Sequence, residues 1–365
     1  MKALAALEIR FVVAELQKLI GARLDRVFNP SEKEVLLELY STSAKKAILR
    51  ATPYGLYIAS SKPSEAAAPS QFCVLLRKYL KNSRLKAVFQ HSSERVVEMA
   101  FASKDADFRL IFELFSRGNI ILCDGKGIIL AVAERQSWST RKISPKEPYK
   151  LPPQRFNLFT LSALQLGNLL KESGKDSVVK VLAADLGIGS TYAEELCILS
   201  SVDKLSDPKK ISPAGVEKIL GAFRELLAKK PQPAVVYEQG KIKDVVPFPL
   251  QYYGGLEQKQ FASYNEALDE VLTNAAFEEI RQDKDKPRQQ RAASLNLRIS
   301  MQEEMFKSLG SSVDENRRKG ELIYENYQDI KEILAEAKAK NFAALKKRPA
   351  VKNIDEKSCS LTVEF

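Results

Sequence analysis

The strongest constraint on the fold is a run of short segments, rich in β-branched and aromatic residues, between residues 85 and 134. The segments read LKAVFQ, RVVEMAFA, FRLIFELF, NIILCD and GIILAVAE, and polar or glycine-containing turns separate them. Branched and aromatic side chains favour strands, and short turns between consecutive strands favour antiparallel pairing. Similar runs, EVLLELY, KAILRA and GLYIAS, occur before residue 60. The sequence therefore predicts an α+β first domain that is dominated by antiparallel sheet.

Two amphipathic helices accompany these strands. Residues 5–20 place apolar side chains close to a helical i, i+4 spacing. Pro69 and Ser70 begin a second helical pattern, APSQFCVLLRKYLKN, whose apolar residues share one face. Arg77 and Lys78 lie off that face and are candidate contacts for RNA phosphates. A solvated helix face is the alternative interpretation.

Residues 138–160 form the predicted boundary of the first domain, which we assign to residues 1–160. The segment WSTRKISPKEPYKLPPQRFN combines four prolines with five basic residues. Prolines and charges at this density are typical of linkers and irregular loops. The segment is therefore either a basic linker or an ordered loop that lies across the first domain.

The most specific local motif of the chain lies in the helical region that follows. In LAADLGIGSTYAEELCIL, two helical patterns flank Gly187-Ile188-Gly189. This spacing resembles the helix-hairpin-helix, a sequence-independent nucleic-acid clamp. Glycines permit a tight turn, and the N–H groups of Gly189, Ser190 and Thr191 at the start of the next helix are candidate phosphate ligands. A packing element without RNA contact is the alternative, because two glutamates follow in the same helix.

Changes in pattern set the remaining domain boundaries. We assign the helical domain to residues 161–232, a strand hairpin or connector to residues 233–262, and the base of a helical arm to residues 263–365. The arm is rich in charged residues and glutamine, and its apolar residues recur in imperfect heptads. Pro287 is expected to start or kink one of its helices. The chain ends in SLTVEF, a strand-like hexapeptide with no visible partner.

Net charge indicates a class of partner. The 365 residues include 57 Lys and Arg against 46 Asp and Glu, a formal net charge of +11. Such an excess attracts polyanions through counterion release, so nucleic acid is the leading partner class. A solubilising surface charge is the alternative.

Cysteine, histidine and hydropathy patterns exclude several classes of protein. The four cysteines lie far apart without a C-x-x-C pair, so we expect reduced thiols, no zinc site and no other cofactor. The single histidine, His91, excludes His-ligated metal centres, and we interpret it as a surface turn residue. No uncharged apolar stretch approaches about 18 residues, so no membrane partner is expected. Glu8, Arg10, Glu15 and Lys18 interrupt any signal peptide, which predicts a cytoplasmic location.

Six segments together resemble the NFACT family. In chain order they are AALEIRFVVAELQKLIGARLDRVFNP, FCVLLRKYLKNSRLKAVFQHSSERVVEM, ELFSRGNIILCD, LGIGSTYAEELC, VPFPLQYY and RRKGELIYENYQDIKEIL. NFACT proteins are ribosome quality control factors, called RqcH in bacteria and NEMF in animals, and the YAEELC and GELIYENY forms lean towards the archaeal branch. The resemblance implies an NFACT-N domain similar in architecture to the Fpg/Nei glycosylases, a helix-hairpin-helix domain, and the start of a coiled-coil middle region. The family's NFACT-R domain has no counterpart in this sequence.

The resemblance implies a binding function and not an enzyme. Family members bind a large ribosomal subunit that still holds peptidyl-tRNA, with its ribosomal RNA, and recruit charged tRNA, chiefly alanyl-tRNA, for mRNA-independent tailing of the nascent chain. The ribosome performs the peptide transfer. Family residues that support tailing, an acidic residue in the first helix and an Asp-Arg pair, match Glu8 and Glu94-Arg95. Glutamate replaces aspartate at both acidic positions, which moves each carboxylate outward by one methylene.

Arg95 is the strongest candidate among these residues. A guanidinium binds phosphate through two hydrogen bonds or stacks on a base, which a lysine ammonium does not do. The alternative is a structural ion pair of Arg95 with Glu94 or with Glu8.

Two other functions compete with RNA binding. A sheet-rich domain followed by a helix-hairpin-helix also describes the Fpg/Nei DNA glycosylases, whose catalytic amine belongs to an N-terminal proline. This chain begins Met1-Lys2-Ala3 and lacks that nucleophile. Relatives have also been described as fibronectin-binding surface proteins. The expected lack of a signal peptide and of disulfides argues against that function.

Overall fold

The computed structural model describes residues 3–30, 34–41, 45–61, 69–154, 156–355 and 360–365, with the backbone alone for residues 45 and 274–290. These residues divide into two compact units, Met1–Arg281 and Gln282–Phe365. The first unit contains every residue that the sequence singles out for RNA contact. Within the described part of the chain, no helix is both long and apolar enough to cross a bilayer.

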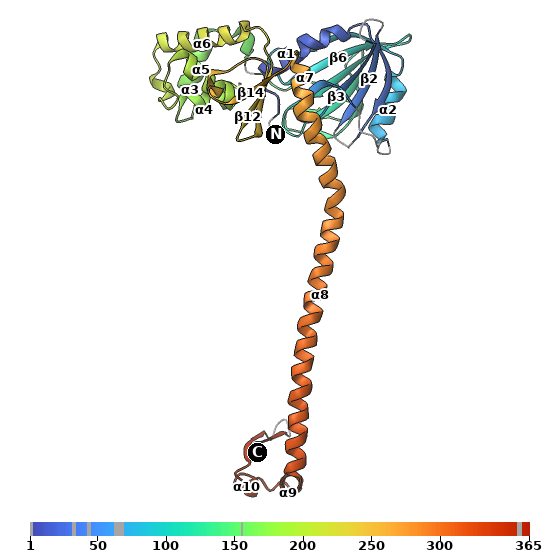
Figure 1. Cartoon of the computed structure of the whole chain (residues 1–365), viewed down its shortest axis with the longest axis vertical. Helices are drawn as coiled ribbons and strands as arrows, with labels where there is room; N and C mark the ends of the chain where they lie inside the picture. The colour runs from blue at the N-terminus through green and yellow to red at the C-terminus, as the bar shows by residue number, and fades with distance from the viewer. Residues whose placement is uncertain (1–2, 31–33, 42–44, 62–68, 155, 356–359) are drawn as a thin grey trace. The chain divides into compact units, whose positions relative to one another are not determined.

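A nine-stranded antiparallel sheet forms the body of the first unit (Figure 1). Its strand order is β4-β3-β2-β1-β5-β6-β7-β8-β9. Strands β5 to β9 are the predicted meander, in which each strand pairs with the next, so the predicted antiparallel sheet is confirmed. The strands are β1 (Arg23–Phe28), β2 (Val35–Ser41), β3 (Lys45–Ala51), β4 (Leu56–Ala59), β5 (Arg84–Gln90), β6 (Val96–Ala102), β7 (Asp107–Glu113), β8 (Asn119–Asp124) and β9 (Ile129–Val132).

Both faces of the meander carry buried apolar side chains. Val97 and Phe112 belong to the main core, which also includes residues of the two predicted helices. Val96 and Ile111 point to the opposite face and belong to a smaller cluster. Because successive strand residues alternate between faces, a sheet with two apolar faces needs cover on both sides. The helices that cover the first face are α1 (Ala6–Leu16) and α2 (Gln71–Leu80).

The boundary segment after β9 covers the second face as an ordered loop. Within it, β10 (Gln136–Ser137) and β11 (Lys142–Ile143) form a small hairpin. Arg141 donates two hydrogen bonds to the buried Glu113 carboxylate, at 2.6 and 3.0 Å, and Tyr149 donates a third at 2.9 Å. Of the two sequence interpretations, the ordered loop is correct. Arg141 is therefore not a free linker cation, because a buried carboxylate neutralises it.

Short helices and a small sheet complete the first unit. The three-stranded sheet has the order β13-β12-β14. Strands β12 and β13 are the hairpin that the sequence predicts, and β14 is a third strand that the pattern did not indicate. The elements are α3 (Ala163–Glu172), α4 (Val178–Lys180), the π-helical turn η3 (Val181–Asp185), α5 (Ser190–Ser200), α6 (Pro213–Ala228), β12 (Ala234–Glu238), β13 (Lys241–Val246) and β14 (Glu257–Gln260).

The segment that leads into the long helix is attached to the first domain. Glu15 of α1 accepts hydrogen bonds from the backbone N–H groups of Tyr264, at 2.7 Å, and Asn265, at 3.0 Å. These residues begin α7 (Tyr264–Leu268). The side chain of Asn265 accepts a hydrogen bond from the backbone N–H of Ile58 in β4 at 2.8 Å. The base of the arm is thus fixed to both α1 and the sheet.

The long helix α8 (Asn274–Glu325) crosses from the first unit into the second. It runs through Pro287, so the expected helix start at that proline is wrong; a long helix tolerates the loss of one backbone hydrogen bond. The terminal SLTVEF segment has a partner, because β16 (Ser360–Val363) pairs antiparallel with β15 (Val351–Asp355). The coiled coil that the family resemblance implies stays a prediction. Two short helices, α9 (Tyr327–Lys338) and α10 (Phe342–Leu345), lie between α8 and this hairpin in the sequence.

Candidate nucleic-acid interface

The Glu94–Arg95 pair lies in the turn between β5 and β6, and two neighbours hold its backbone. The Gln90 side chain donates hydrogen bonds to the carbonyl oxygens of Glu94 and Ala6, both at 2.9 Å. The carbonyl oxygen of Arg95 accepts a hydrogen bond from the backbone N–H of Leu114 at 2.8 Å. The turn is therefore tied to α1 on one side and to the β7–β8 turn on the other.

The side chains of Glu94 and Arg95 are half-buried. Burial lowers the pKa of Arg95 and raises the pKa of Glu94, and each group partly offsets the shift of the other. Among the described residues, no hydrogen bond or ion pair reaches the Arg95 guanidinium, whether from Glu94 or from Glu8. A partly desolvated guanidinium whose donors are unused favours an anionic partner from outside the chain. Glu94 interacts with Arg95 electrostatically, so both the RNA contact and the structural ion pair stay predictions.

Glu8 lies in a different environment from the one that the family resemblance implies. Its side chain is 0% exposed. Its carboxylate accepts hydrogen bonds from the backbone N–H of Ala5, at 2.6 Å, and from the hydroxyl of Tyr192 in α5, at 3.0 Å. Glu8 thus joins the sheet domain to the helical domain. These contacts lie within the protein, and the role of Glu8 in tailing stays a prediction.

Arg77 borders a small basic cavity of about 220 Å³ between β1 and α2. Its Nε atom donates a hydrogen bond to the carbonyl oxygen of Val27 at 2.8 Å, which fixes the orientation of the guanidinium. Arg26 and Lys81 line the same cavity, together with one carboxylate, Asp25. The Nε atom of Arg26 lies 3.6 Å from an Asp25 oxygen and 3.9 Å from a Glu38 oxygen, so Arg26 is already paired. Arg77 and Lys81 have no ion pair among the described residues, and two such cations beside so small a space suit a phosphate oxygen.

The sequence pointed to only part of this basic cavity. Lys78 is exposed outside the cavity, and its Nζ atom lies 5.5 Å from the centre of the Tyr79 ring. Arg26 and Lys81 were missed, because β1 and α2 are far apart in sequence and only their packing brings these cations together. The i, i+4 relation of Arg77 and Lys81 on one helix is the only local signal that could have found one of them.

The glycine turn before α5 has the backbone that its sequence predicts. Gly187 and Gly189 adopt φ values of +80° and +87°, which side chains other than glycine rarely tolerate. The N–H of Gly189 is not free for phosphate, since it donates to the carbonyl oxygen of Ala183 at 3.2 Å. The Thr191 side chain is buried, whereas Ser190 is exposed at the first position of α5. Ser190 therefore keeps the geometry expected of a phosphate ligand, and the helix-hairpin-helix assignment stays a prediction.

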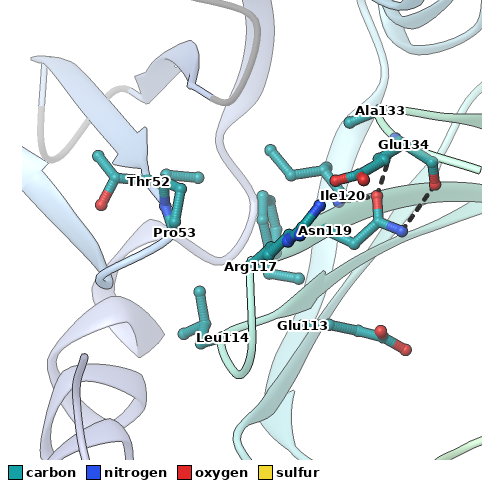
Figure 2. A pocket seen from close by; sticks show the side chains of 12 residues that line it. Thr52, Pro53, Glu113, Leu114, Arg117, Asn119, Ile120, Ala133 and Glu134 are labelled. Carbon is teal, nitrogen blue, oxygen red and sulfur yellow. Dashed lines mark hydrogen bonds between the residues drawn. The ribbon is translucent and has the colours of Figure 1, made fainter. Parts of the chain in front are cut away.

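A larger cavity of about 370 Å³ opens beside the β7–β8 turn (Figure 2). Arg117 is an exposed cation on that turn. The side chain of Asn119 connects this turn to the segment after β9. It donates a hydrogen bond to the carbonyl oxygen of Glu134 at 2.9 Å and accepts one from the backbone N–H of Glu134 at 3.1 Å. The lining residues are Ala51, Thr52, Pro53, Phe112, Glu113, Leu114, Arg117, Gly118, Asn119, Ile120, Ala133 and Glu134.

Arg117 and Arg95 belong to the same end of the sheet. Alternate turns of an antiparallel meander lie at the same end, so the β5–β6 and β7–β8 turns are neighbours. The hydrogen bond between the Leu114 N–H and the Arg95 carbonyl oxygen joins them directly. This topology is the signal from which the sequence could have indicated Arg117.

His91 is not a free surface residue, which corrects its sequence interpretation. Its Nε2 atom lies 2.8 Å from the buried Glu98 carboxylate, which also accepts two hydrogen bonds from Arg109 at 2.6 and 2.7 Å. Burial raises the pKa of Glu98, but the hydrogen bonds from Arg109 and His91 outweigh it and lower this pKa to about 2. The cluster therefore stabilises the second face of the sheet. In the described ranges, no group of three or more His, Cys, Asp and Glu side chains is placed to hold a metal ion.

Comparison with known proteins gives a family and two relatives. The family model described as the NFACT N-terminal and middle domains matches residues 6–358. The archaeal Rqc2 homologue aRqcH of Methanocaldococcus jannaschii is 31% identical over 338 residues, which cover 88% of this chain and 50% of that protein. The human ribosome quality control complex subunit NEMF is 23% identical over 354 residues, which cover 89% of this chain and 33% of that protein. The chain thus spans half of the length of the archaeal relative and a third of the length of the human one.

A solved structure shares the fold. The N-terminal part of the fibronectin/fibrinogen-binding protein from Streptococcus suis matches with a TM-score of 0.59 and 22% sequence identity, over 74% of this chain and 100% of that one. At this identity the likeness concerns the fold alone.

The family model covers nearly the whole sequence, and the archaeal relative is 31% identical to this chain over 338 residues. This chain belongs to the NFACT family.

Proposed function

We propose that this chain is an RNA-binding ribosome quality control factor. It binds a large ribosomal subunit that is obstructed by peptidyl-tRNA, and it positions tRNA, alanyl-tRNA in particular, for mRNA-independent tailing of the stalled nascent chain. Relatives in animals and yeast are named as subunits of the ribosome quality control complex. Because the chain spans only part of these proteins, their complete activity is included here as a proposal.

The environment of Arg95 is the observation that most directly supports the proposal. Its backbone is held from both sides, and its half-buried guanidinium has no hydrogen-bonding partner among the described residues. Desolvation of this cation is unfavourable in the isolated chain, and Glu94 offsets it only in part. A phosphate or a stacked base offsets that cost when RNA binds.

The charge distribution supports a polyanionic partner. The chain carries a net charge of +11. Arg26, Arg77 and Lys81 surround one small cavity, and Arg117 is exposed at the same end of the sheet as Arg95. Several phosphate contacts of this kind give binding that weakens steeply with added salt.

Peptide transfer is assigned to the ribosome in this proposal. Burial raises the pKa of the Cys123 thiol to about 12 and that of the Cys197 thiol to about 11. A thiol of this kind is a poor nucleophile at neutral pH, because the thiolate is the reactive form. The factor would act by holding tRNA in position, in a cytoplasmic setting where ribosomes work.

Measurement of tRNA affinity tests the proposal. Arg95→Ala is expected to weaken tRNA binding by about tenfold and to reduce the slope of log K against log salt by about one. Arg317→Ala is the matched control, since it removes the same charge from an exposed, ion-paired position on α8. Arg95→Lys should fail to restore full affinity if the guanidinium geometry matters. Equal affinities of the wild type and Arg95→Ala would remove Arg95 as a contact.

Purification of the tagged chain from its native cytoplasm tests the ribosomal partner. Large-subunit RNA and proteins that copurify with an enriched tRNA at moderate salt would support the proposal. Recovery of a mixed, unspecific set of RNAs would contradict subunit binding by this chain.

Two alternatives have their own tests. Cleavage of abasic or oxidised duplex DNA, or an adduct trapped by borohydride, would favour an Fpg/Nei-like glycosylase. The name of the Streptococcus suis protein suggests fibronectin or fibrinogen binding for that protein. Recovery of the native chain from an extracellular fraction without lysis would favour a similar role here.

A further inference from the structure

Trp138 is the only tryptophan of the chain, and it lies on the surface. It begins the four-residue loop of the β10–β11 hairpin, where its backbone N–H donates to the carbonyl oxygen of Arg141 at 2.9 Å. Its side chain is 43% exposed although a large core lies nearby. Tryptophan usually buries its large apolar surface, so an exposed indole on an ordered hairpin suggests a contact outside the chain.

One face of the Trp138 indole is held by a buried cation. The Arg141 guanidinium lies 4.5 Å from the centre of the ring, and it also contacts the Phe115 ring at 5.6 Å. Arg141 is only 8% exposed, and its two hydrogen bonds to Glu113 fix its plane. A cation at this distance attracts the ring and orients it. The indole therefore has one supported face and one face available to solvent.

The segment around Trp138 keeps two unpaired cations. Arg141 is paired with Glu113, and Lys142 lies 2.8 Å from a Glu147 oxygen. Lys146 is exposed and has no ion pair among the described residues. Arg135 is exposed, and the described residues provide it with no ion pair. The hairpin follows β9 at the end of the sheet where the β5–β6 and β7–β8 turns also lie. An aromatic ring among cations is the combination that binds unpaired nucleotides, since bases stack on the ring while phosphates meet the charges.

We propose that Trp138 is a stacking platform for an unpaired base of the bound RNA, with Arg135 close by for the adjoining phosphate. Arg141 acts as a positioning residue, because it holds the indole from below and is itself neutralised by Glu113. This inference rests on the proposed RNA-binding function and adds a contact to it. Single-stranded loops and ends of tRNA present such unpaired bases, whereas a blunt RNA duplex does not.

Intrinsic fluorescence tests the contact directly, because all tryptophan emission comes from Trp138. Saturating tRNA or a single-stranded RNA oligonucleotide is expected to quench this emission after correction for RNA absorbance. A blunt duplex of the same length should quench it far less. Anisotropy of labelled RNA measures binding independently of the indole. RNA that binds by anisotropy without any change in emission would overturn the inference.

Substitutions separate this inference from the proposed function. Trp138→Ala is expected to weaken binding of the single strand by about tenfold, and Trp138→Phe should retain most of the affinity because a ring remains. Tyr40→Ala is the matched control, an aromatic that is 53% exposed on β2. Unchanged RNA affinity in folded Trp138→Ala protein would overturn the stacking role while the RNA-binding function stands. Copurification of ribosomal proteins that is lost with this variant, at unchanged RNA affinity, would assign Trp138 to a protein contact instead. Absence of RNA binding by the wild type would refute the proposed function itself.

Discussion

Removal of the Tyr192 hydroxyl should weaken the junction between the sheet domain and the helical domain. This hydroxyl donates to the Glu8 carboxylate at 3.0 Å, and Glu8 is fully buried. A hydrogen bond to a charged group contributes about 1.5–3 kcal/mol, and a buried carboxylate that loses a donor is costly. We therefore expect Tyr192→Phe to lower the free energy of unfolding by about 2 kcal/mol. The ring contact with Phe248, 6.4 Å between centres, is retained in this variant.

Thermal and urea unfolding measure this effect. For a unit of this size, about 2 kcal/mol corresponds to a fall in Tm of roughly 3–6 °C. Tyr40→Phe is the control, because its exposed side chain should change stability by less than about 0.5 kcal/mol. A double-mutant cycle of Tyr192→Phe with Glu8→Gln should show a coupling of about 0.5–3 kcal/mol. A Tm equal to that of the wild type, or a coupling near zero, would refute the structural role of Glu8.

The same variants separate stability from RNA binding. If Glu8 acts through the junction, Glu8→Gln protein that is still folded at the assay temperature should bind tRNA as the wild type does. Arg95→Ala should behave in the opposite way, with normal stability and weaker binding. Loss of tRNA affinity in folded Glu8→Gln protein would contradict the assignment.

Four further substitutions test the fold. The pKa of Glu98 in the folded protein is about 2, against its usual 4.5. Its charged form therefore stabilises the fold above about pH 4.5, and this contribution is lost as the pH falls towards 2. The Tm difference between the wild type and Glu98→Gln should shrink from pH 7 to pH 2, and a constant difference would contradict this role of Glu98. Gly118→Ala should cost about 2 kcal/mol or more in urea unfolding, since the residue has φ +72° and a Cβ atom would lie 2.9 Å from the Pro53 Cα atom. Gly189→Val should lower the Tm, whereas Gly167→Ala inside α3, where a Cβ atom meets nothing within 4 Å, should raise stability by about 0.5–1 kcal/mol. Equal changes in Tm for Gly189→Val and Gly167→Ala would count against the left-handed backbone at Gly189.

Local patterns were reliable where one segment carries all of the information. The β5–β9 meander follows from branched and aromatic runs with turns between them, and every predicted pairing joins neighbours in sequence. Local sequence patterns gave wrong predictions where a structure depends on residues that are distant in the sequence. SLTVEF finds its partner in Val351–Asp355, a charged strand that the sequence did not indicate. Pro287 lies inside α8, although proline usually kinks or ends a helix.

The candidate site shows the same division. The sequence singled out Arg95 and Arg77 by motif, and in the structure Arg95 is half-buried while Arg77 is exposed; their contact with RNA stays a prediction. It matched Glu8 to a family tailing residue and left the segment of Arg141 open between a basic linker and an ordered loop, and in the structure both side chains are buried in hydrogen-bonded pairs. A motif identifies the type of residue, but its exposure depends on the segment that packs over it.

The sequence by itself determined the family, the antiparallel character of the first domain and the net positive charge, because collinear motifs, side-chain alternation and composition are properties of the chain. Only the tertiary structure decided which charges are available. Packing of α5 against α1 buries Glu8, and packing of the 138–150 loop against the sheet neutralises Arg141 while it leaves Trp138 exposed. Availability depends on contacts between segments that are distant in sequence, so no local pattern encodes it.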